Sequence, residues 1–101
     1  MSAQVQPNRC FSLGQLVFTP DAKDALAELN VSPFALLSRH QRTDWGDLDE
    51  EDKQANQEAL QTGGRLLSAY IIQDVKFWVN TEAEDDRGHR LATTILLPSE
   101  Y

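Results

Sequence analysis

Residues 65–81, RLLSAYIIQDVKFWVNT, decide the fold class of this chain. Two runs in this stretch alternate with a period of two and are rich in Ile, Val, Tyr, Phe and Trp, the composition of strands. Gln73-Asp74 lies between the runs and leaves room for a tight turn, so the stretch predicts a β-hairpin. A third strand is expected in RLATTILL at 90–97, because it has the same composition and Pro98 closes it. Trp78 falls on the open side of the sheet if Val75, Phe77 and Val79 meet the helices.

Upstream of the hairpin, apolar residues recur at helical spacing. Thr19-Pro20 and Ser32-Pro33 each place an N-cap residue before a proline at the first helical position, which predicts two helix starts. Asn30 suits the left-handed position that ends the first helix. The apolar stripes that these two helices would bury are Ala22, Ala25, Leu26 and Leu29, then Phe34, Leu36 and Leu37.

A third helix is predicted before the hairpin. Asp47 and Glu50 have the spacing of a capping box, and Gly63-Gly64 marks the helix end. The expected buried stripe of this helix is thin: Leu48, Ala55, Ala59 and Leu60.

The segment FSLGQLVF at 11–18 predicts an N-terminal strand with Phe11, Leu13 and Val17 on one face, although Gly14 interrupts it. We therefore expect a flexible tail at 1–10 and a single α+β domain over 11–101. In this domain the N-terminal strand and three short helices pack on a C-terminal antiparallel β-meander. The last strand is a potential unpaired edge unless another segment covers it, and a homodimer through the sheet is possible.

Composition limits the partners of this chain. Its 101 residues carry a formal charge of −7, which argues against direct binding to nucleic acid or to an anionic membrane surface. Cys10 is the only cysteine, so no intramolecular disulfide can form and a cytoplasmic location is favoured. No leader-like or membrane-spanning stretch is recognised in the sequence.

The segment 43–60, TDWGDLDEEDKQANQEAL, concentrates the negative charge: it holds seven of the sixteen carboxylates and one lysine. One interpretation is a well-capped helix start whose charges face water. The functional hypothesis is a surface that binds a protein with a basic patch. Trp45 would either pack this segment against the core or act as an exposed anchor for the partner. The predicted partner-binding residues are Asp44, Trp45, Asp47, Asp49, Glu50, Glu51, Asp52 and Glu58.

Two other functions fit parts of the sequence. The carboxylates could imitate phosphates, which would make the protein an anti-restriction or anti-defence decoy. Alternatively, His40 could be a general acid or base of a small nuclease or hydrolase, oriented by Asp44 or Glu82 with Arg65 or Arg90 stabilising an anion. His40 also has a simpler role, because a histidine near a helix C-terminus complements the helix dipole.

No cofactor is predicted. One cysteine and two histidines, His40 and His89, cannot form a standard zinc set, and no glycine-rich phosphate loop is present. The acidic loop at 84–86 could hold a cation loosely, but a solvated loop is the favoured interpretation.

The stretches TDWGDLDEEDKQAN, RLLSAY, FWVNTEA and LATTILLPSEY, with FSLGQLVFTPDAKDAL and SPFALLSRH before them, resemble a family of small uncharacterised bacterial proteins. The resemblance covers Phe11 to Tyr101. Members of the family carry labels such as "plasmid-related protein" and are associated with mobile elements and restriction–modification loci. The family has no established activity, so the resemblance implies no catalytic residues. The loop EAEDDRGHR is longer and more acidic than in the family pattern.

Overall fold

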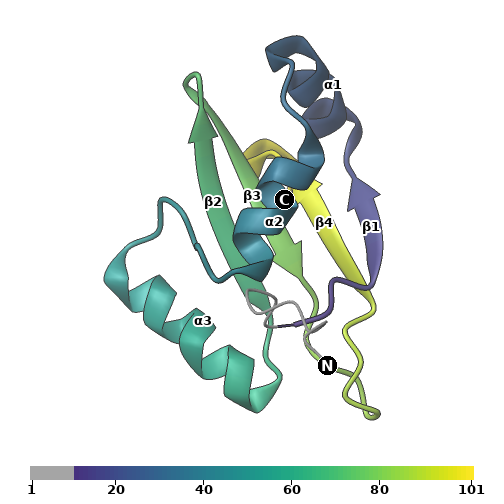
Figure 1. The fold of residues 1–101 in the computed structure, drawn as a ribbon, viewed down its shortest axis with the longest axis vertical. Helices are drawn as coiled ribbons and strands as arrows, with labels where there is room; N and C mark the ends of the chain where they lie inside the picture. Colours follow the sequence, from purple (N-terminus) through teal and green to yellow (C-terminus); the bar gives the residue numbers. More distant parts are fainter. Residues whose placement is uncertain (1–10) are drawn as a thin grey trace, which may run out of the picture.

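A computed structural model of the protein describes residues 11–101, and the tail predicted for residues 1–10 lies outside the described residues. Residues 11–101 form three α-helices, a four-stranded sheet and a C-terminal 3-10 turn (Figure 1). The elements are β1 (Gln15–Phe18), α1 (Pro20–Leu29), α2 (Pro33–Gln41), α3 (Glu50–Thr62), β2 (Leu66–Ile72), β3 (Val75–Thr81), β4 (Ala92–Leu96) and η1 (Pro98–Glu100). The predicted α+β fold and order of elements are confirmed.

The sheet has the strand order β1-β4-β3-β2 and is mixed. Strands β2, β3 and β4 form the predicted antiparallel meander, and Gln73 and Asp74 make the hairpin turn with positive φ at both positions, 49° and 70°. Strand β1 pairs with β4 in parallel. The prediction that the last strand is an edge was therefore wrong. Strand β4 lies inside the sheet, because the helices between β1 and β2 carry the chain over to the far side.

The first strand is shorter than predicted, and its faces are reversed. Gly14 adopts a left-handed φ of 67°, and a Cβ atom there would overlap the backbone carbonyl of Arg90. Because Gly14 is left-handed, the alternation of side chains between the two faces of the sheet is shifted before β1 begins. Leu16 and Phe18 consequently pack against the main core, whereas Val17, predicted on the buried face, is 38% exposed.

The main core lies between the sheet and helices α1 and α2, which cover one of its faces (Figure 1). Its buried residues are Ala22, Leu26, Leu36, Leu37, Tyr70, Phe77, Val79 and Ile95. Trp78 points to the other face, as its alternation with Phe77 and Val79 predicts, and is half-buried there with its ring centroid 5.4 Å from that of Tyr101.

Helix α3 lies apart from the other two helices and packs along β2 (Figure 1). A second cluster of Trp45, Ala59 and Leu66 joins them. The helix begins two residues later than predicted: Asp49 is the N-cap, and its carboxylate accepts a hydrogen bond from the Asp52 N–H at 2.8 Å. The predicted stripe was also wrong at Ala55, which is exposed.

The outer edge of β2 is covered at Leu67 and Ala69 by two devices from the same chain. Asn56 is buried on α3, and its side-chain amide donates to the Leu67 carbonyl at 2.8 Å and accepts from the Leu67 N–H at 3.1 Å. Two residues further along β2, the Ala69 N–H donates to the Trp45 carbonyl at 3.1 Å and the Ala69 carbonyl accepts from the Asp47 N–H at 2.6 Å. These contacts satisfy backbone groups that an edge strand otherwise leaves free.

The second device requires a glycine at position 46. Gly46 has a φ of 74°, and a Cβ atom there would overlap the Ala69 carbonyl oxygen and press on the Tyr70 ring. We expect Gly46→Ala to lower the free energy of unfolding by about 3 kcal/mol or more, because backbone strain and steric overlap add. Chemical denaturation measures the loss.

Gly88→Ala is the matched control for this substitution. Gly88 also has a positive φ, 79°, but its Cβ would meet only the Glu84 carboxylate at 3.9 Å. Its cost should be about 1 kcal/mol from conformation alone. Equal losses in the two variants would show that the close approach of Gly46 to β2 is unimportant.

Candidate functional site

The predicted acidic segment is exposed on the outer side of α3 and on the turn before it. Of the eight predicted partner-binding residues, seven are exposed and only Trp45 is buried. Asn56 and Ala59 turn inward toward β2, so the opposite side of the helix faces solvent. We define the acidic face as the exposed carboxylates that this side and the preceding turn present: Asp47, Asp49, Glu50, Glu51, Asp52 and Glu58.

Few charges within the described residues neutralise the acidic face. Lys53 lies 3.7 Å from the Glu50 carboxylate, and both side chains are substantially exposed. No other ion pair within residues 11–101 reaches the face. Three of its carboxylates, those of Glu50, Glu51 and Asp52, occupy the first turn of α3, where the helix dipole favours negative charge. The face therefore carries a local excess of negative charge that the fold tolerates.

Trp45 does not belong to this surface, and the interpretation of it as an exposed anchor for a partner was wrong. The side chain is 4% exposed and packs with Ala59 and Leu66 in the second core cluster. Its ring stacks near Phe11, with centroids 6.5 Å apart, and meets the edge of His40 at 5.8 Å. Burial follows because Gly46 forms a β-bridge with Ala69 and the Trp45 carbonyl accepts from the Ala69 N–H, which holds Trp45 between β2 and α3. The alternative interpretation, that Trp45 packs the acidic segment onto the core, is confirmed.

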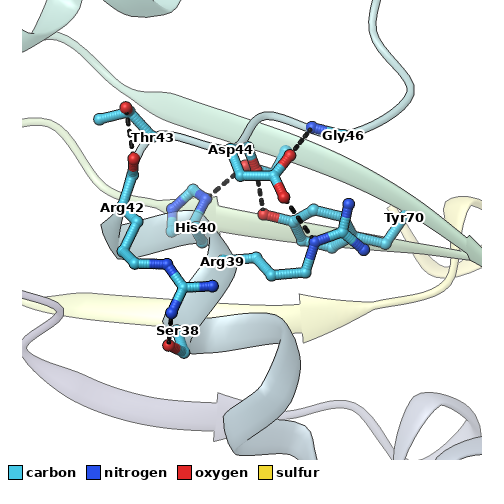
Figure 2. A network of polar contacts seen from close by, with 9 residues as sticks. Ser38, Arg39, His40, Arg42, Thr43, Asp44, Gly46 and Tyr70 are labelled. Atoms are coloured by element: carbon cyan, nitrogen blue, oxygen red, sulfur yellow. Dashed lines mark hydrogen bonds and ion pairs between the residues drawn. The ribbon is translucent and has the colours of Figure 1, made fainter. Parts of the chain in front are cut away.

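Asp44 is exposed but is bound by its own neighbours (Figure 2). The Arg39 Nε donates to the Asp44 carboxylate at 2.7 Å, and the Arg39 guanidinium lies 4.3 Å from the centre of the Tyr70 ring. The Tyr70 hydroxyl donates to the Asp44 carbonyl at 2.5 Å, and the Gly46 N–H donates to the carboxylate at 3.2 Å. The bond from Arg39 holds the pKa of Asp44 below its usual value. Asp44 therefore fixes the turn that reaches β2. Because its carboxylate is paired with Arg39, it adds less unneutralised negative charge to the surface than a carboxylate of the acidic face does.

His40 is fully buried and takes part in a chain of hydrogen bonds. Its Nδ1 lies 2.6 Å from the Ser68 hydroxyl and its Nε2 lies 2.9 Å from the Thr81 hydroxyl. The Thr81 and Thr93 hydroxyls are 2.7 Å apart, and Thr93 donates to the Leu13 carbonyl at 2.7 Å. Because each hydroxyl has one proton, Thr81 must donate to Thr93 and accept from Nε2–H. Nδ1 then accepts from Ser68, which assigns the neutral imidazole to one tautomer.

The residues predicted to assist His40 are not assembled around it. Neither the Asp44 nor the Glu82 carboxylate forms a hydrogen bond to the ring, whose two nitrogens bond to the hydroxyls named above. The buried Arg90 side chain donates to the carbonyls of Gly64 at 2.6 Å and Ala59 at 3.3 Å, which places it at the C-terminal end of α3. Arg65 donates to the Tyr101 hydroxyl instead. His40 is therefore part of a buried hydrogen-bond network that stabilises the fold.

The acidic loop before β4 is closed on itself. The Asp85 carboxylate accepts from the backbone N–H groups of Arg87 and His89, each at 2.9 Å, and these bonds lower the pKa of Asp85. Within residues 11–101, no group of three His, Cys, Asp or Glu side chains is placed to hold a metal ion.

Two important residues had weak sequence signals. Asn56 lies three residues before Ala59, on the same side of the helix, so the period of the buried stripe would have placed it inward. Arg90 is preceded by a loop and had no signal, because its role depends on the end of α3, which is distant in sequence.

No family model, curated protein or solved structure matches the chain. The resemblance to small bacterial accessory proteins stays a prediction. Each helix within residues 11–101 is too short or too polar to cross a lipid bilayer.

The buried histidine makes stability depend on pH. Burial lowers the pKa of His40 to about 3, and the charge of Arg90 acts in the same direction. The unfolded chain, with a histidine pKa near 6.5, binds this proton more readily than the folded protein, so stability falls as pH drops below about 6.5. We expect a loss of about 2 kcal/mol between about pH 7 and pH 5, measured by urea denaturation.

His40→Gln is the matched variant, because glutamine keeps a donor and an acceptor but does not titrate in this range. The substitution should lower the free energy of unfolding at neutral pH. It should also remove most of the change in that free energy between about pH 7 and pH 5. If the free energy of unfolding changes equally with pH in the parent protein and the variant, titratable groups other than His40 cause the change.

Proposed function

We propose that the protein is a non-enzymatic binding protein whose acidic face engages a basic patch on a protein partner. The observation that carries this proposal is the set of exposed carboxylates on α3 and its preceding turn, most of which have no ion pair within residues 11–101. A like-charged face costs stability through repulsion, and a basic partner would relieve that cost.

The fold holds this face in one arrangement. Asp49 caps the first turn of α3, the Asn56 amide joins the middle of the helix to Leu67, and Arg90 binds carbonyls at its C-terminal end. A helix fixed at three places loses little conformational freedom when a partner binds, which favours affinity.

The spacing along α3 suits recognition by charge. Glu51 and Glu58 are seven residues apart and therefore lie on one side of the helix, about 10 Å from each other along its axis. Ala55, exposed between them, leaves a small flat surface that a lysine or arginine side chain can cross. Binding of this kind is fast and sensitive to salt, because it depends on screened, exposed charges.

The alternatives gain different amounts of support. A decoy that imitates nucleic acid would use the same carboxylates. If the partner is a DNA-binding protein and the protein competes with DNA for it, the decoy is favoured over a simple protein-binding role. The hydrolase alternative gains none, since His40 is fully buried and its nitrogens are bonded to hydroxyls. A cytoplasmic location is part of the proposal and rests on the single cysteine. An accessory role on a mobile element rests on the sequence resemblance alone.

The test is capture of a partner by the tagged protein and by a variant with a reversed face. In Glu51→Lys/Glu58→Lys, two carboxylates become two ammonium groups, so the net charge rises by four, from −7 to −3. We expect a stoichiometric partner from host lysate at low salt, lost at high salt and reduced at least about tenfold for this variant. Quantitative mass spectrometry of the captured proteins gives the measurement.

The control is Asp24→Lys/Glu28→Lys, which makes the same charge change at two exposed positions of α1. This variant should retain the partner, and both variants should keep the thermal stability of the parent within a few degrees. Equal losses in both would mean that net charge, and no particular face, governs capture. Unchanged capture by the α3 variant would overturn the proposal.

A further inference from the structure

The two edges of the sheet differ in their protection. Strand β1 bonds to β4 on one side, through Gln15 N–H to the Leu91 carbonyl at 2.9 Å and Thr19 N–H to the Ile95 carbonyl at 3.1 Å. In a parallel pair, alternate residues direct their backbone groups to the neighbouring strand, so those of Leu16 and Phe18 point away from the sheet. Within residues 11–101, no backbone bond reaches these outward groups.

Strand β1 is short, with four residues, but it lacks two features that usually guard an edge, charged side chains and proline. Its sequence is QLVF, with no charge and no proline, and three of its four residues are apolar. The opposite edge is covered at Leu67 and Ala69 by the chain itself. The free edge at β1 is therefore a template for one more strand, and an uncharged apolar strand is the segment that fits it.

The distribution of charge favours a second copy of this chain as the source of that strand. The acidic face is carried by α3, which packs on β2 at the opposite edge of the sheet from β1. Two copies that meet at β1 place their acidic faces at the two far ends of the joined sheet, where repulsion between these faces opposes association least.

We propose that the protein forms a two-fold symmetric dimer by antiparallel pairing of β1 with β1 of a second copy. The outward groups set the register: Leu16 and Phe18 of one copy form hydrogen-bonded pairs with Phe18 and Leu16 of the other, about a Val17–Val17 pair without hydrogen bonds. The two four-stranded sheets become one sheet of eight strands. The pairing covers Val17, which is 38% exposed on the side of the sheet away from the helices.

The helix side of the new pairing is also apolar. Phe18 lines a pocket of about 270 Å³ with Leu26, Val31 and Pro33. In the register above, Leu16 of the second copy lies beside Phe18 on this side of the sheet, because directly opposed residues share a face. The dimer does not depend on the partner proposed for the acidic face, and each can fail without the other.

A disulfide trap tests the register. In Cys10→Ser/Val17→Cys the introduced thiol is the only cysteine, and opposed residues of such a pair have Cα atoms about 4.5 Å apart, within the range that a disulfide spans. We expect mild oxidation to give a covalent dimer on non-reducing gels. The control is Cys10→Ser/Ile71→Cys, since Ile71 is 52% exposed but lies on β2, and it should remain monomeric.

Sedimentation over about a hundredfold range of concentration tests the dimer without cross-linking. The parent protein should dimerise as concentration rises. Val17→Lys should raise the dissociation constant at least about tenfold, because it places two like charges opposite each other, whereas Ile71→Lys should leave it unchanged. A parent that stays monomeric throughout, or equal cross-linking of the Val17 and Ile71 variants, would overturn the proposal. Occupation of the β1 edge by residues of its own chain would give the monomeric result.

Discussion

One buried chain of hydrogen bonds holds the layers of this protein together. It runs from Ser68 on β2 through His40 on α2 to Thr81 on β3, and then through Thr93 on β4 to the Leu13 carbonyl before β1. His40, Thr81 and Thr93 each bond to two other members, so the network joins α2, strands β2, β3 and β4 and the segment before β1. A buried polar network of this kind stabilises the fold only when every group is satisfied, as these are.

This network explains why a residue with the chemistry of a catalyst serves the fold here. The imidazole of His40 is neutral, keeps one tautomer and is shielded by aromatic rings, with that of Phe11 edge-on at 5.1 Å. A general acid or base must reach its substrate, and this ring is fully buried with both nitrogens bonded to hydroxyl groups. Function is consequently sought on the surface, where the exposed carboxylates of α3 and the free edge of β1 are the two features that the interior does not explain.

These two features lie at opposite edges of the sheet, and their separation is informative. The segment from Trp45 to Asp47 and the Asn56 side chain close the β2 edge, so the acidic helix is attached where the backbone is already satisfied. The negative charge of α3 thus lies beside the β2 edge, and the uncharged strand β1 lies at the opposite edge. We infer two independent modes of association: recognition by charge through α3 and addition of a strand through β1.

The sequence by itself determined the local structure of the protein. The Ser32 hydroxyl accepts from the Phe34 N–H, Asn30 ends α1 with a φ of 59°, and Gln73-Asp74 makes the predicted turn. Each of these depends on residues within a few positions in the chain, so composition and spacing reveal them.

Only the tertiary structure decided the parallel place of β1, the burial of Trp45 and the inward turn of Asn56. The partners of these residues are distant in sequence: the Trp45 carbonyl accepts from the Ala69 N–H, and Gly14 abuts the backbone at Arg90. The acidic surface could be predicted because exposure is the default for clustered charge. Which of its residues bind a partner and which bind the protein itself, as Asp44 binds Arg39, depends on contacts that form only when distant segments meet.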